Sequence, residues 1–387
     1  MQERVMLIDR RTIAHFDWML LLSALVIPAA GLIVLYSAGH DPDASQKVFP
    51  WLPFESYSPA FARQLVFILA GSLLILAGVM IPSQVLHRYS YLVYGACVTA
   101  LVLVAAVGVT AKGSQRWLSI AGITFQPSEM MKLALVIGMA RFLAHHPPPP
   151  GGYRFLQLFA PFALIAVPMG LIAMQPDLGT AISVGAVGFC MMLFMGIRLS
   201  SLAAMAAAVV AVLVPFWEVL LKPYQKRRIL VLFNPDVDPL GSGYHIIQSK
   251  IAVGSGQLFG KGFMQGTQTQ LEFLPEHTTD FIFSVLSEEW GFAGAMLLIA
   301  LFLLLFYRLL KVVMRSRDLF AGLVALGISA QLFVNAFINM AMVVGILPVV
   351  GIPLPLVSYG GTSLLSMMFS LGIVLGISMR RHLYAGR

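Results

Sequence analysis

The sequence predicts an all-α membrane protein with many spanning helices. Hydrophobic residues make up 59% of the 387 positions, and charged residues make up only 11%. This composition excludes an ordinary soluble domain. The apolar residues also lie in runs of about 18 residues or more, the length that a helix needs to cross the hydrocarbon core of a membrane.

We expect ten spanning helices within a single transmembrane domain that covers residues 1–387. Cys97 and Cys190 both fall inside apolar runs, so we expect neither a disulfide framework nor a thiolate metal site. The expected helices are Trp18–Ser37, Gln64–Ile81, Tyr89–Thr110, Ser128–His145, Phe155–Met174, Leu178–Met195, Leu202–Leu221, Asp280–Tyr307, Phe320–Val344 and Leu356–Met379.

The distribution of lysine and arginine gives the orientation of these helices. If the N-terminus is cytoplasmic, most of these residues fall in inner segments, and the short outer loops hold only Lys47, Arg63, Lys112 and Arg116. Because cytoplasmic loops carry the excess of positive charge, both termini are predicted to lie in the cytoplasm.

One long outer loop, residues 222–279, departs from this pattern because it is basic. Long loops cross the membrane largely regardless of charge, so the predicted orientation stands. The positive charge suits an anionic partner such as a phosphate-bearing lipid, although simple attraction to lipid headgroups would explain it equally well. Its basic residues are Lys222, Lys226, Arg227, Arg228, Lys250 and Lys261.

Ionisable residues concentrate between Leu271 and Gly291, at the mouth of the eighth expected helix. They are Glu272, Glu276, His277, Asp280, Glu288 and Glu289. A charged side chain inside a membrane costs roughly 2.5–3.5 kcal/mol on insertion scales, so such residues are functional candidates. We predict that Asp280 is the reactive group of a membrane-embedded enzyme. The alternative is that Asp280 only caps the N-terminus of the helix.

Three more ionisable residues lie near the outer ends of other expected helices. Glu129 and Lys132 share one face of the fourth helix at a spacing of three, either as a functional pair or as an ion pair that fixes packing. Asp177 precedes the sixth helix and could be only its cap. With Asp280, these residues could converge on one site.

The last outer loop and the ninth helix add polar groups without charge. The loop from Gly345 to Gly361 is rich in proline and glycine, so its backbone must be buried or line a cavity. We expect the Ser358 hydroxyl to face the outer vestibule. Gln331, Asn335 and Asn339 form one stripe of the ninth helix, for which hydrogen bonding between helices is the favoured explanation.

The inner halves of the expected helices have no ionisable residue away from their ends. A transporter of a large charged headgroup would need polar groups through the whole thickness of the membrane. A catalyst that acts on a lipid-linked substrate in the outer leaflet needs them at one end only. The pattern therefore favours the catalyst.

Several motifs resemble one family closely. They are KGSQRWL, QPSEMMK, GYHIIQSKIAVGSG, GKGFMQGTQTQLEFLPEHTTDFIFSVLSEEWG and GIPLPLVSYGGTSLL. Together they make the whole chain similar to the SEDS family (shape, elongation, division and sporulation), and the GTQ to TDFIF segment favours its elongation branch over its division branch. The chain departs at Thr278, where the family pattern has a histidine; here the histidine comes one position earlier, at His277.

The resemblance implies a peptidoglycan glycosyltransferase that polymerises lipid II at the outer face of the bacterial cytoplasmic membrane. Asp280 would be the general base, and Lys132, Arg116 and a divalent cation (Mg²⁺ or Mn²⁺) would meet the leaving diphosphate. Glu129 would position Lys132. Asp177, Trp117, Glu276 and Ser358 complete the expected substrate site, although Trp117 could instead be an interfacial anchor.

The resemblance also implies partners. A class B penicillin-binding protein (a transpeptidase) and other membrane proteins of the elongation complex are expected, and nucleic acid is not. Two alternatives remain open: a lipid II flippase, and a non-catalytic scaffold that recruits the transpeptidase.

Overall fold

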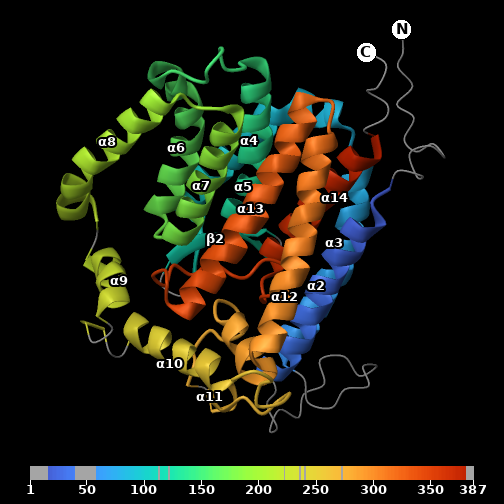
Figure 1. Ribbon diagram of the computed structural model, residues 1–387, viewed down its shortest axis with the longest axis vertical. Coiled ribbons are helices and arrows are strands. Elements are labelled where there is room, and N and C mark those ends of the chain that lie inside the picture. Colours follow the sequence, from blue (N-terminus) through green and yellow to red (C-terminus); the bar gives the residue numbers. More distant parts are fainter. Residues whose placement is uncertain are drawn as a thin grey trace.

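The computed structural model describes residues 16–39, 58–111, 114–120, 123–221, 223–234, 237–238, 241–271 and 273–380 (Figure 1). The long helices are α2 (Trp18–Ala38), α3 (Pro59–Met80), α4 (Ser83–Val107), α5 (Pro127–His145), α6 (Phe159–Met174), α7 (Leu178–Met195), α8 (Leu199–Pro215), α12 (Ile282–Arg315), α13 (Leu319–Val344) and α14 (Gly361–Arg380). Shorter pieces are η1 (Phe155–Leu158), η2 (Phe216–Leu220), α9 (Pro223–Phe233), α10 (Ser242–Ser255) and α11 (Thr267–Gln270).

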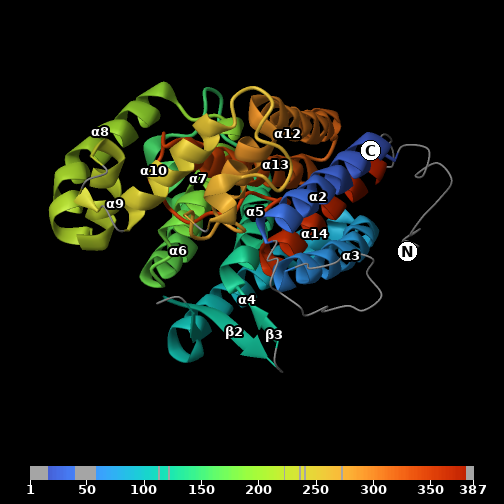
Figure 2. The same cartoon turned by 90° about the horizontal axis from the view of Figure 1, so that it is seen from below.

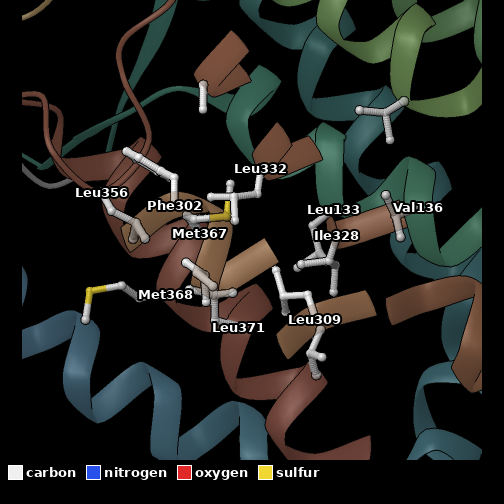
Figure 3. Close-up of a cluster of buried hydrophobic side chains, with 14 of the residues drawn as sticks. Leu133, Val136, Phe302, Leu309, Ile328, Leu332, Leu356, Met367, Met368 and Leu371 are labelled. Atoms are coloured by element: carbon white, nitrogen blue, oxygen red, sulfur yellow. The ribbon is translucent and has the colours of Figure 1, made fainter. Parts of the chain in front are cut away.

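The long helices form a tilted bundle around α13 and α14, while α8 and α9 lie at its edge (Figures 1 and 2). Figure 3 shows part of the packed centre, whose buried side chains include Val136 of α5, Ile328 of α13 and Met367 of α14. The backbones of α3 and α14 approach closely because glycines face the contact: a Cβ on Gly78 would lie 2.7 Å from the carbonyl oxygen of Phe369. Small residues commonly allow such approach in membranes.

Polar contacts tie the ends of distant helices together at one end of the bundle. Asp17, which caps α2, accepts hydrogen bonds from the Arg308 guanidinium near the end of α12. The Arg380 guanidinium at the end of α14 donates to the carbonyl oxygens of Val79, Met80 and Ile81 at the end of α3. The start of α2 and the ends of α3, α12 and α14 therefore lie together, at what we call the terminal end.

All ten expected spans are helical, but eight described helices are long and apolar enough to cross a membrane. The two that fall short are α5 and α8. The α5 helix carries Glu129, Lys132 and Arg141 within 19 residues, and the apolar part of α8 is only Leu199–Val212. The predicted orientation of the termini depends partly on residues 1–15 and 381–387, which lie outside the described residues, as do Lys47, Lys112, Lys222 and Glu272.

The prediction of an all-α chain was wrong in one loop. Strands β1 (Val109–Ala111), β2 (Ser114–Ile120) and β3 (Ile123–Phe125) form an antiparallel sheet in the order β1-β2-β3, with Val109 paired to Trp117 and Leu118 paired to Phe125. The third expected helix, α4, consequently ends at Val107 and not at Thr110. The segment is rich in β-branched residues, which favour strands.

The long outer loop is mostly helical and carries α9, α10 and α11. Helix α12, which follows it, begins at Ile282 instead of Asp280 and extends to Arg315 instead of Tyr307. Its backbone leaves the helical conformation at Gly291, where φ is 64° and ψ is −162°. The last helix begins at Gly361 and not at Leu356, because the Pro- and Gly-rich segment before it is irregular.

Candidate functional site

Asp280 lines a cleft of about 570 Å³ at the end of the bundle opposite the terminal end. The cleft is formed where the long outer loop and the start of α12 meet the irregular segment before α14. Its lining residues are Pro223, Arg227, Arg228, Asp238, His245, Glu276, Asp280, Phe281, Val349 and Gly351. Six of these ten carry an ionisable side chain, in a chain that is 11% charged. Strongly charged clefts of this kind are candidate active sites.

The backbone around Asp280 is held from two sides. The Asp280 amide donates to the carbonyl oxygen of Glu276 (3.1 Å), and the side-chain amide of Asn339 donates to the carbonyl oxygens of both Asp280 and Ile352 (2.8 Å each). Gly351, with φ of 74°, lies beside the carboxylate: a Cβ on it would be 3.5 Å from Asp280 Oδ2. Since the N-cap of α12 is Phe281, Asp280 does not occupy the capping position considered from the sequence.

Glu276 and His245 both line the cleft, and the Glu276 carboxylate acts electrostatically on the His245 imidazole. Glu276 begins the turn before α12 with φ of 56°, and its carboxylate accepts a hydrogen bond from the Thr279 hydroxyl (3.2 Å). Burial lowers the pKa of the His245 imidazole, while the carboxylates of Glu276 and Asp238 raise it by a smaller amount. The Nδ1 atom of His245 is buried and has no hydrogen-bond partner. Burial therefore favours the neutral form of this imidazole.

Arg227 and Arg228 supply the positive charge of the cleft. Both belong to α9, and Arg227 lies 4.0 Å from Asp238. In the sequence these two residues stand out only as part of a basic loop, and His245 only within a motif. The available signal was the run of Lys226, Arg227 and Arg228 in an outer segment. What the sequence did not give was the fold of the loop, which brings α9 to Asp280.

A second group of charges lies where β2 meets the start of α7. Asp177 caps α7 by accepting from the Thr180 amide (3.2 Å), and it also accepts from the side-chain amide of Gln126 (3.2 Å). The Arg116 guanidinium lies 3.8 Å from the Asp177 carboxylate and donates to the carbonyl oxygens of Gln175 and Pro176. The capping role considered for Asp177 is confirmed, together with an ion pair.

Glu129 and Lys132 form a closed pair in the first turns of α5. Lys132 Nζ lies 2.8 Å from Glu129 Oε1, and the two residues are 3–4% exposed. Trp117 is half-buried in β2 beside Arg116. Among the described residues, the cleft lining includes Asp280 and Glu276 of the predicted site but not Glu129, Lys132, Asp177, Arg116 or Trp117. Their substrate-binding roles stay predictions.

Ser358 is buried instead of facing a vestibule. Its hydroxyl accepts from the Leu354 amide (2.8 Å) and donates to the carbonyl oxygen of Thr279 (2.5 Å), one residue before Asp280. The Tyr359 amide likewise donates to the Thr278 carbonyl oxygen (3.0 Å). The segment before α14 thus fixes the turn that carries Asp280, so Ser358 acts on the backbone in this structure.

The donor set for a divalent cation is incomplete. Within the part of the chain that the structure describes, no group of three or more His, Cys, Asp or Glu side chains is arranged to hold a metal ion. The carboxylates of the cleft are accompanied by two guanidinium groups, which suit an anion better than a cation.

Comparison with known proteins gives the family. The model of the FtsW, RodA and SpoVE proteins, described as a cell cycle protein family, matches residues 17–383. The chain belongs to this family. It is the SEDS family that the motifs predicted, and the match extends over all the elements described above.

SEDS relatives and solved SEDS structures are similar over most of their length. The peptidoglycan glycosyltransferase MrdB of Escherichia coli (strain K12) is 44% identical over 82% of this chain and 85% of its own. The peptidoglycan glycosyltransferase RodA of Treponema pallidum is 30% identical over 96% and 99%. The crystal structure of the rod shape determining protein RodA of Thermus thermophilus is 28% identical, with a TM-score of 0.68 over 95% and 98%.

A second solved structure concerns an assembly. It is described as the structural coordination of polymerization and crosslinking by a peptidoglycan synthase complex. The matching chain is 30% identical, with a TM-score of 0.78 over 95% of this chain and 98% of that chain. The fold is therefore shared with a protein that functions within such a complex.

Proposed function

We propose that this chain is a peptidoglycan glycosyltransferase that polymerises lipid II during cell elongation, with Asp280 as its general base. The observation that carries the proposal is the cleft in which Asp280 lies beside Arg227 and Arg228. Membership of the SEDS family and the names of the relatives MrdB and RodA support the same activity.

The negative Asp280 and the positive Arg227 and Arg228 serve different parts of the reaction: proton removal from the acceptor and stabilisation of the leaving diphosphate. Asp280 accepts the proton of the acceptor hydroxyl while its oxygen attacks the anomeric carbon of the donor sugar. The bond from that carbon to the diphosphate breaks, and the diphosphate leaves with its negative charge. Arg227 and Arg228 stabilise this charge, because guanidinium groups bind phosphate oxygens with paired hydrogen bonds.

The membrane arrangement follows from the lysine and arginine distribution. We place the terminal end in the cytoplasm and the cleft at the outer face of the bacterial cytoplasmic membrane. In this arrangement α5 and α8 also cross the membrane, which gives ten spanning helices. Helix α9 then lies in the headgroup region, at the depth of the diphosphate of a lipid-linked substrate. A class B penicillin-binding protein and other elongation-complex membrane proteins are the proposed partners, and the synthase complex with a similar chain supports the first of these.

The proposal is tested by glycan-chain formation from lipid II. The purified protein and its cognate transpeptidase are assayed with a transpeptidase inhibitor present, comparing the wild type with Asp280→Asn. Loss of a general base lowers the rate by about 100-fold to 10,000-fold. Chains from the wild type alone support the proposal, and undiminished polymerisation by Asp280→Asn contradicts the role of Asp280.

The flippase alternative predicts a different result. Neither protein would then form chains, although both remained folded and bound to the partner. Lipid II translocation in liposomes would decide that case. A scaffold would show neither activity while still binding the transpeptidase.

A further inference from the structure

Helix α12 is divided into two parts by its break at Gly291. The outer part, residues 282–290, begins one residue after the Asp280–Phe281 edge of the cleft, and the inner part, residues 292–315, is the apolar span. A break in a helix leaves backbone donors and acceptors without intrahelical partners, and these must be satisfied inside a membrane protein.

The loop that follows α10 satisfies the backbone on both sides of the break. The amides of Phe292 and Ala293 donate to the carbonyl oxygens of Gln257 (2.8 Å) and Leu258 (2.9 Å). In the other direction, the amides of Lys261 and Gly262 donate to the carbonyl oxygens of Glu288 and Glu289 (3.0 Å each). The loop is thus bonded to α12 on both sides of the break.

Glycine makes this contact possible. A Cβ on Gly256 would overlap the carbonyl oxygen of Ser287, and a Cβ on Gly260 would overlap that of Glu289. Gly291 itself lies against the Gly260 amide in a backbone conformation that L side chains rarely adopt. The backbone of the loop therefore packs directly against the backbone of α12 at the break.

The Glu288 carboxylate locks the loop to the outer part of α12. Glu288 is fully buried, and its Oε1 atom accepts from Lys261 Nζ (2.6 Å), the Gln268 amide (3.0 Å) and the Thr267 hydroxyl (3.2 Å). A buried charge of this kind is costly unless it is paired and hydrogen-bonded. Lys261 supplies the only full positive charge that the structure shows within ion-pair distance of Glu288 among the described residues.

We infer that Lys261 and Glu288 are positioning residues that fix the outer part of α12, and with it Asp280, relative to the cleft. The break separates residues 282–290 from the membrane span, so the span cannot set their orientation through a continuous helix. The loop, locked by the Lys261–Glu288 pair, holds this part from one side, while Asn339 and Ser358 hold the turn before it from the other. The inference rests on the proposed role of Asp280, because the pair acts through that residue and does not line the cleft.

The test measures the initial rate of polymerisation against lipid II concentration for Lys261→Met. A misplacement of about 1 Å at a reacting group can lower a rate by about 100-fold. We expect kcat to fall at least about 10-fold while KM changes less than about 2-fold, since the side chains that bind substrate are untouched. The conservative variant Lys261→Arg keeps the charge and is expected to recover most of kcat.

The matched control breaks another ion pair of the same helix. Arg308 pairs with Asp17 (2.5 Å) at the terminal end, and Arg308→Met removes it far from the cleft. Melting temperatures in detergent are measured for every variant. The inference holds if Lys261→Met alone loses kcat at a melting temperature no lower than that of Arg308→Met.

Two results separate this inference from the proposed function. If Asp280→Asn is inactive but Lys261→Met retains the wild-type kcat, the positioning role fails and the proposed function stands. If Asp280→Asn is active, the proposed function fails first. Equal losses of kcat in Lys261→Met and Arg308→Met would show that the Lys261–Glu288 pair contributes only to general stability, and would overturn the inference.

Discussion

Two groups of charged residues lie at the same end of the bundle, and they differ in whether they line the cleft. In the closed group, Lys132 bonds Glu129 and Arg116 contacts Asp177, and no member lines the cleft in the described structure. In the open group, Arg227, Arg228 and Asp280 surround a cavity. Charges placed between helices hold those helices together, while charges that line a cavity can also contact a ligand, even where they pair with a protein group as Arg227 does with Asp238.

The largest expected effect comes from breaking the closed group. Lys132→Met leaves the Glu129 carboxylate buried without its cation, which costs about 3–5 kcal/mol of unfolding free energy. We expect a large drop in melting temperature and in detergent-solubilised yield. The double variant Glu129→Gln/Lys132→Met removes both charges and should recover most of the loss.

The activity of that double variant tests the substrate-binding role that the sequence predicts for Glu129 and Lys132. A stable but inactive double variant would support substrate binding by the pair. A stable and active one would limit the pair to packing of α5. A double variant no more stable than Lys132→Met would contradict the comparison itself, since charge compensation would not then be what the pair provides.

The open group should respond in activity and not in stability. Replacing Arg227 and Arg228 by alanine removes the charge that meets the diphosphate, and kcat/KM for lipid II should fall about 100-fold. Lys226→Ala is the matched control, because Lys226 is on the same helix and faces Glu218 (3.8 Å), outside the cleft lining. An equal loss from Lys226→Ala would show that only the net charge of the loop matters.

A smaller effect is expected at Asp177, whose cap and ion pair can be separated. Asp177→Ala removes both and should cost about 1 kcal/mol of stability. Asp177→Asn keeps a capping oxygen for the Thr180 amide and loses the charge that faces Arg116. The melting temperature of Asp177→Asn should therefore lie between those of Asp177→Ala and the wild type. Identical losses in the two variants would show that the cap contributes no measurable stability.

The smallest effect is a pH dependence at His245. Burial lowers its folded-state pKa below the ordinary value, so at acidic pH the unfolded chain binds a proton before the folded one does. Stability should fall as the pH drops below about 6.5 and level off once the folded imidazole is also protonated. His245→Gln should flatten this part of a plot of melting temperature against pH; an unchanged slope would argue against a buried imidazole.

Sequence patterns predicted the helices well because apolar runs report directly on membrane burial. The run from Leu178 to Met195 was predicted with both boundaries correct. The sheet of β1 to β3 was missed because its strands are short and lie between two apolar helices. Local patterns of this length carry little weight against the surrounding composition.

The candidate site was predicted in part. Asp280 and Glu276, which stand out as charges in an apolar chain, both line the cleft. Asn335 does bond between helices, accepting from Ser183 (2.5 Å). The sequence could not distinguish charges that pair with each other from charges that line a cavity. It also gave no sign that Asn339 bonds the Asp280 carbonyl, since that contact joins residues 59 positions apart.

The break at Gly291 has a consequence for the match between protein and lipid. An unbroken helix of 34 residues would be about 51 Å long, much more than the hydrocarbon thickness of a bilayer. The inner part, residues 292–315, is only about 36 Å long. With its basic end among the lipid headgroups, it fits a bilayer without strong tilt. Bilayer thickness therefore acts on the inner part alone, and the position of Asp280 relative to that part is set by contacts within the protein, from the loop and from Asn339 and Ser358.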